Sequence, residues 1–163
     1  MKRHPGLVPI SHEHRQILFI AQVLRRGAVR YRGAPATTSE KLKYARQSLT
    51  DVVLPHMQRE EEILFPAVGG IDDEVDALIV ALIAEHRALA ETIANLNDDG
   101  VDAVTLEGRL DSLGALLETH VRCEERILFQ RLQAVLTDEA LQAPGDQWRA
   151  AGTGAACLLE GGS

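Results

Sequence analysis

The sequence predicts an all-α protein: an antiparallel four-helix bundle with up-down-up-down topology and a pseudo-twofold internal repeat. Three observations lead to this prediction. Apolar residues recur in alternating steps of four and three, no segment shows the two-residue period of a half-buried strand, and a ten-residue pattern occurs twice. A chain of 163 residues fits one domain, and with 45% hydrophobic but only 4% aromatic residues its core must be mainly aliphatic.

Four segments carry this periodicity, and each is expected to form one helix of the bundle. The first runs from Ile10 to Ala28 and the third from Val75 to Leu96. The inward-facing residues of the second are expected at Leu49, Val53, His56, Glu60, Ile63 and Ala67, and those of the fourth at Leu106, Leu110, Leu113, Leu117, His120, Glu124 and Ile127.

Turn-forming and capping residues separate these segments. After a loop over 33–39, Thr37 and Glu40 have the spacing of a capping box for the second helix. Pro66 with the Gly-Gly pair at 69–70 ends that helix, Asp72 or Asp73 caps the third, and 97–100 forms the turn before the fourth.

The C-terminal part of the chain is rich in Gly and Ala and has no apolar period. We therefore expect a bundle domain over residues 1–142 and a loosely docked or disordered segment over residues 143–163. Trp148 is the one residue expected to anchor that segment.

The internal repeat carries polar residues at matching positions. The pattern His-x-x-x-Glu-Glu-x-Ile-Leu-Phe begins at His56 and again 64 residues later at His120, and Glu13-His14-Arg15 recurs 72 residues later as Glu85-His86-Arg87. Two helical hairpins of the same design suit a bundle with approximate twofold symmetry.

Six polar residues occupy inward-facing positions of these four helices: His14, His56, Glu60, His86, His120 and Glu124. A single histidine on an apolar face is usually a hydrogen-bonded core residue, and a single His-x-x-x-Glu pair is usually solvated. Six together are different, because each unpaired buried carboxylate costs several kcal/mol while a domain is stable by only about 5–15 kcal/mol. Two divalent or trivalent metal ions would neutralise the carboxylates and use the imidazoles, and this donor set favours iron, manganese or zinc.

These motifs resemble the hemerythrin-like family, also called the HHE cation-binding domain, over about Pro9 to Leu136. The resemblance implies a four-helix bundle around two non-haem iron ions joined by an oxo or hydroxo bridge. By the same resemblance, His14 and His56 would bind one iron, His86 and His120 the other, and Glu60 and Glu124 would bridge them.

The chain departs from the oxygen-carrying members of that family at two places. They have a second histidine four residues from the first on the third helix, where this chain has Leu82 and Ala90 on either side of His86. Their fourth helix has an aspartate one residue beyond the position of Glu124. The resulting H–HxxxE–H–HxxxE pattern resembles a non-carrier subgroup linked to peroxide and nitric oxide, and it leaves a coordination position open at the His86/His120 metal.

Four neighbouring residues are weaker candidates for a role in the site. His12 is expected at the surface, with a role as a substitute ligand as the alternative. Glu61 and Glu125 are expected to flank the core without binding metal. Glu85 is expected either to hydrogen bond to an imidazole or to be solvated.

Composition limits the function classes. The net charge of −7 argues against nucleic acid or an anionic membrane as a partner, and the longest apolar run has eight residues where a membrane span needs about 20. Two cysteines without a C-x-x-C pattern and no recognisable signal peptide predict a cytoplasmic protein. The sequence gives no oligomeric state.

The favoured function is catalase-like redox turnover of hydrogen peroxide or a related species by a di-iron protein. One alternative is a sensor or binding protein for O2, NO or iron without turnover. Another is a structural bundle that contains zinc or no metal. The small-molecule ligand would accordingly be H2O2, O2 or NO.

Overall fold

The computed structural model describes residues 2–27, 32–97 and 99–157, and the described chain is helical without strands. Four long helical runs form the bundle. The first run is α1 (Val8–Leu24) and the third is α5 (Asp73–Ala94). The second run consists of α2 (Thr38–Ser48), η1 (Leu49–Val53), α3 (Leu54–Arg59), η2 (Glu60–Leu64) and α4 (Phe65–Val68). The fourth consists of α6 (Ala103–Cys123), η3 (Glu124–Leu128) and α7 (Phe129–Val135); the elements η1, η2 and η3 are π-helical turns.

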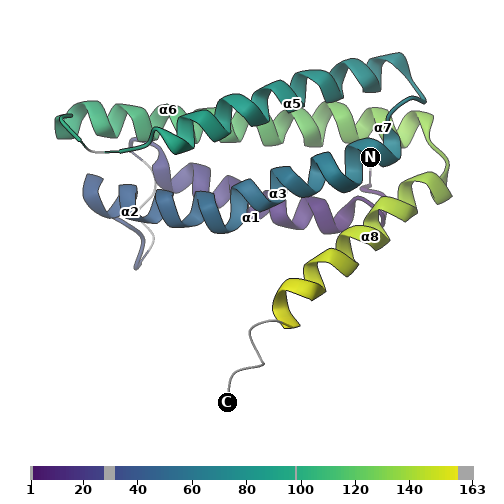
Figure 1. Ribbon diagram of the computed structural model, residues 1–163, viewed down its shortest axis with the longest axis horizontal. Helices are drawn as coiled ribbons and strands as arrows, with labels where there is room; N and C mark the ends of the chain where they lie inside the picture. Colours follow the sequence, from purple (N-terminus) through teal and green to yellow (C-terminus); the bar gives the residue numbers. More distant parts are fainter. Residues whose placement is uncertain (1, 28–31, 98, 158–163) are drawn as a thin grey trace.

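The four runs alternate in direction, as the predicted up-down-up-down bundle requires. In Figure 1 the chain passes along α1, returns along α2 and α3, passes back along α5 and returns along α6 and α7. None of the described helices has the length and apolar composition that crossing a membrane requires.

The predicted caps are confirmed where the structure describes them. Thr37 accepts a hydrogen bond from the Glu40 backbone N–H, and the Glu40 side chain accepts one from the Thr37 N–H, which completes the capping box. Asp72, rather than Asp73, caps α5 by accepting from the Val75 N–H. The position predicted to face inward at Ala28 lies outside the described residues.

The apolar core consists of two clusters with a polar layer between them. One cluster lies toward the α2 end of the bundle and includes Ile17, Leu49 and Leu113. The other lies toward the α7 end and includes Ile10, Leu64 and Phe129. The predicted histidines and glutamates lie between the two clusters, so apolar side chains separate them from solvent at both ends of the bundle.

The π-turns correct the predicted inward face after each site glutamate. The apolar periodicity predicted core positions at Ile63, Ala67 and Ile127, but Ile63 is partly exposed, Ala67 is exposed, and Ile127 is 53% exposed. Their places are taken by Leu64, Val68 and Leu128, all fully buried. The physical reason is that η2 begins at Glu60 and η3 at Glu124, and each π-turn adds one residue to the turn, so the apolar face shifts by one position.

A fifth helix, α8 (Asp138–Cys157), crosses the bundle obliquely beside α1 and α4 (Figure 1). The sequence predicted a loosely docked or disordered segment over residues 143–163, but residues 143–157 belong to this helix. Residues 158–163 lie outside the described part of the chain. The crossing depends on two glycines, because a Cβ on Gly145 would lie 2.2 Å from the Gly6 carbonyl oxygen and a Cβ on Gly6 1.9 Å from that of Leu141. Such close backbone approach is open only to glycine.

Candidate metal centre

The six predicted site residues converge in the polar layer. Each is at most 4% exposed, and they come from all four helical runs of the bundle. Two overlapping groups have ligand atoms within 4.8 Å of one another: His14, His56, Glu60 and Glu124, and then Glu60, His86, His120 and Glu124. We call His14 and His56 the first half of the centre, and His86 and His120 the second half.

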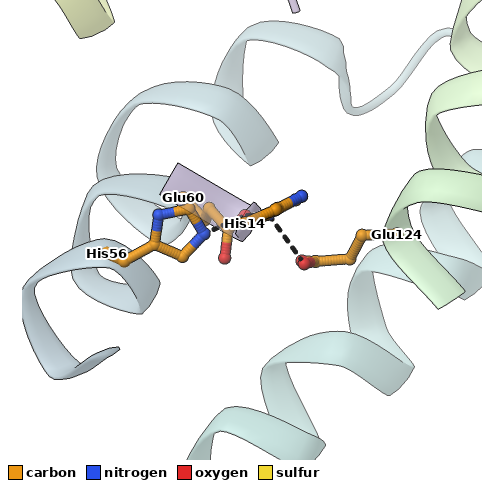
Figure 2. A group of neighbouring side chains, drawn as sticks. All are labelled: His14, His56, Glu60 and Glu124. Carbon is orange, nitrogen blue, oxygen red and sulfur yellow. Dashed lines mark hydrogen bonds and ion pairs between the residues drawn. The ribbon is translucent and has the colours of Figure 1, made fainter. Parts of the chain in front are cut away.

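The two carboxylates face both halves. Glu60 Oε1 lies 3.1 Å from His56 Nε2 and 3.4 Å from His14 Nε2, while its Oε2 lies 3.4 Å from His86 Nε2. Glu124 approaches from the side opposite His56 (Figure 2), with Oε2 3.2 Å from His14 Nε2 and Oε1 3.6 Å from His120 Nε2. Each glutamate therefore presents one oxygen to each half, which is the arrangement that a bridging carboxylate needs.

Each imidazole is held from outside by a second carboxylate. The Nδ1–H groups of the four histidines donate to four different glutamates at 2.7–2.9 Å: His14 to Glu125, His56 to Glu13, His86 to Glu61, and His120 to Glu85. A carboxylate that accepts from one ring nitrogen of a histidine is the usual companion of a metal bond at the other.

This hydrogen bonding fixes which ring nitrogen can bind a cation. An ionised carboxylate only accepts, so each Nδ1 carries the proton and each Nε2 of a neutral imidazole carries a lone pair. His86 Nε2 and His120 Nε2 then face each other at 3.1 Å. Two lone pairs repel at that distance, whereas neighbouring ligand atoms on one metal ion with bonds of about 2.1 Å lie about 3 Å apart.

Several buried polar atoms in the centre lack a hydrogen-bond partner among the described residues. They are His56 Nε2, Glu60 Oε2, and both carboxylate oxygens of Glu124. Their contacts with neighbouring side chains are close enough for ion pairs but do not meet the geometry of hydrogen bonds. Because an unsatisfied buried polar group costs about 1–3 kcal/mol and a charged one more, this donor set fits a bound cation.

The charges in the centre shift the pKa values of its members. Burial alone lowers the pKa of His56, but the Glu60 charge and the hydrogen bond to Glu13 raise it to about 9. Burial likewise acts to lower the pKa of His14, yet its carboxylate neighbours raise it well above its usual value. Burial acts to raise the pKa of Glu60, but the surrounding histidines lower it well below its usual value. Positive charge is therefore needed to stabilise the buried carboxylates, and either protons on the histidines or metal ions can supply it.

The surroundings of the first half are closed. Arg3 pairs with Glu125 and lies over the Phe129 ring, which in turn stacks on His14. Burial acts to raise the pKa of Glu125, but the His14 hydrogen bond and the Arg3 charge lower it to about 2. On the other side, Arg59 pairs with Glu13, and Trp148 from α8 donates its Nε1–H to Glu13 Oε1 at 2.9 Å.

The surroundings of the second half are more open. The side chains of Glu61 and Glu85 are 39% and 47% exposed, against 29% and 23% for those of Glu13 and Glu125 in the first half. A surface pocket of about 270 Å³ lies beside His86 between α3 and α5, and Leu54, Met57, Glu61 and Ala90 contribute to its lining. The small Ala90 side chain helps leave this space beside His86.

The apolar periodicity located the six inward residues but did not assign the outer carboxylates. Glu61 and Glu125 were expected only to flank the core, and Glu85 either to support an imidazole or to be solvated; all three accept from an imidazole Nδ1. Glu13 was not singled out, although its place in the repeated Glu-His-Arg motif opposite Glu85 was the available signal. His12 is exposed and lies outside the two ligand groups.

Comparison with known proteins gives one match. The family model of the hemerythrin HHE cation-binding domain matches residues 7–132, which include all six inward site residues and end before α8. No curated protein and no solved structure matched the chain.

Proposed function

The chain belongs to the hemerythrin HHE cation-binding domain family, and on that premise we propose that it holds two non-haem iron ions and consumes hydrogen peroxide. The observation that carries the proposal is the double set of ligand atoms around Glu60 and Glu124. His14 and His56 would hold one iron, His86 and His120 the other, and the two glutamates would bridge them. Imidazole and carboxylate donors without thiolate suit iron.

In the proposed reaction, two molecules of hydrogen peroxide give two of water and one of dioxygen. One peroxide loses two electrons and the other gains two, and the bound irons would supply the redox capacity for this exchange. The residues of the chain keep the imidazoles in the tautomer that binds metal, exclude bulk water with the two apolar clusters, and keep the Glu60 carboxylate ionised.

The pocket beside His86 supports access of a small ligand to the second half. It lies next to Glu61, the carboxylate that accepts from His86 Nδ1 at 2.8 Å, and it opens between α3 and α5. Its volume of about 270 Å³ is ample for H2O2, O2 or NO. On the first half, Trp148, Arg3 and Arg59 lie around the outer carboxylates instead.

The test is to purify the protein from iron-sufficient cells without chelators, measure iron and zinc per chain, and follow oxygen release after peroxide is added anaerobically. We expect two irons per chain, near-ultraviolet absorption from an oxygen-bridged pair, and one O2 for every two peroxides consumed. Stoichiometric zinc without iron, or iron without peroxide loss, would contradict the proposal.

Binding or sensing of O2 or NO without turnover is the second candidate. One observation favours it: among the described residues, the interior carboxylates serve as ligands and each outer carboxylate already accepts from an imidazole, so no side chain in the centre stands free as a general acid. A spectrum that changes reversibly with O2 or NO, together with unchanged peroxide, would select this candidate.

A further inference from the structure

Helix α8 reaches the metal centre although it lies beyond the residues that the family model matches. Its Trp148 is 2% exposed and meets the His56 ring edge-on, with ring centroids 5.3 Å apart. A tryptophan buried against a ligand histidine does more than cover the bundle, because its indole N–H also has a partner in the centre.

That partner is Glu13, and it links Trp148 to His56. Trp148 Nε1–H donates to Glu13 Oε1 at 2.9 Å, while Glu13 Oε2 accepts from His56 Nδ1 at 2.9 Å and from Arg59. The Arg59 guanidinium also lies over the Trp148 ring, 4.4 Å from its centroid. Both oxygens of the Glu13 carboxylate are thereby fixed, and with them the orientation of the His56 ring.

The second half has no equivalent of this arrangement. Glu85, the repeat counterpart of Glu13, accepts from His120 Nδ1 at 2.7 Å, and among the described residues no other hydrogen bond or ion pair reaches its carboxylate. The repeat counterpart of Arg59 is Cys123, which cannot supply a cation. The Glu85 side chain is also nearly half exposed, so water competes for its carboxylate.

We propose that Trp148 is a positioning residue: it holds Glu13, and through it His56, so that the first half of the centre binds its metal ion more tightly than the second half. This inference rests on the proposed metal centre. A carboxylate that is held in place keeps the imidazole in the orientation and tautomer that bind metal, and loss of such support typically lowers metal affinity 10–100-fold.

The experiment is a titration of the full-length apoprotein with Co²⁺ at pH 8, followed by calorimetry and by the visible spectrum. We expect two binding steps of unequal affinity. Glu13→Gln should weaken the tighter step by about 10–100-fold, Trp148→Phe should weaken it less because the ring contacts remain, and Glu85→Gln should weaken only the looser step. In Trp148→Phe the spectrum of the first Co²⁺ should change as well.

Gln147→Ala, an exposed neighbour on the same helix, is the matched control and should leave both steps unchanged. Two binding steps of equal affinity, or a Glu13→Gln effect confined to the looser step, would overturn the inference without contradicting the proposed metal centre. Absence of any Co²⁺ binding would instead overturn the proposed function. If Trp148→Phe loses its helical circular dichroism, the comparison of Glu13→Gln with Glu85→Gln decides the inference.

Discussion

The two halves of the centre present the same donors to the interior and different surroundings to the outside. Each has two imidazoles whose Nε2 atoms face two shared carboxylates, and each imidazole has its own outer glutamate. Around the first half those glutamates are held by Arg3, Arg59 and Trp148. Around the second they face solvent beside a pocket. The comparison teaches that two sets of the same donor residues, related by an internal repeat, can have unequal surroundings.

The largest effect should come from the residues that both halves share. Glu60→Ala and Glu124→Ala each remove oxygens from both halves at once, so iron per chain should fall to near zero, as measured by metal analysis after identical purification. Glu61→Ala and Glu125→Ala remove only an outer acceptor and should weaken one half by about 10–100-fold. If the variants at positions 61 and 125 lose all iron while the Glu60 variant keeps it, the bridging ligands would be Glu61 and Glu125, one residue after the proposed positions.

The difference between the halves should widen as the pH rises. His56, with its pKa raised to about 9, holds a proton that a metal ion must displace, so cation affinity should increase from pH 6.5 to pH 9, above all in the first half. Co²⁺ titrations at several pH values would measure this. Constant affinity across that interval would contradict the raised pKa.

The stability of the apoprotein should change in the opposite direction. A histidine whose pKa is raised by folding stabilises the fold fully below its unfolded pKa of about 6.5 and loses that contribution as the pH rises through its folded value. Glu60 stays ionised throughout this interval, since its pKa is lowered well below its usual range. The Tm of the apoprotein should therefore fall by several degrees between pH 6.5 and pH 9, whereas the metal-loaded protein should change little.

Filling the pocket beside His86 should affect ligand entry without affecting metal binding. Ala90→Phe narrows the space beside the second half, so azide should bind the iron-loaded protein several-fold more slowly in stopped-flow absorbance, with two irons retained. Ala94→Phe, at an exposed position one turn further along α5, is the control. Equal rates in both variants would mean that ligands enter elsewhere.

The smallest effect should come from the crossing of α8 over the N-terminal segment. Gly145→Ala places a Cβ against the Gly6 backbone and should loosen α8 by about 1–3 kcal/mol while the bundle stays folded. Trp148 is the only tryptophan, so a red shift of its fluorescence would report the change directly. Gly152→Ala meets nothing closer than 3.9 Å and should leave the emission unchanged.

The bundle and the six inward residues could be predicted because both follow from periodicity. Steps of four and three identify the buried face of each helix, and a histidine or glutamate on that face must find a charged partner. The buried positions of Leu64 and Leu128 could not be predicted, because the pattern does not reveal that a π-turn begins at Glu60 and at Glu124. Pro66 follows the first of these turns, but no proline follows the second.

Helix α8 was missed for a different reason. Pro144 and Gly145 indicate a break when the chain is considered locally, but here Pro144 lies inside the helix and Gly145 permits contact with a segment far away in sequence. The outer carboxylates are a similar case. Whether Glu13 or Glu61 supports an imidazole depends on which helix lies opposite, and that is a tertiary property.

The position of α8 in the chain has a consequence for biosynthesis. The residues of the four bundle helices are synthesised before the 20 residues of α8, which take a further interval of about 1–4 s at typical translation rates. During that interval His56 and Glu13 are not yet covered by Trp148, so a cation can reach the first half from the side that the mature fold closes. When a full-length apoprotein is refolded before metal is added, a cation must instead bind the first half with the Trp148 indole already packed over it.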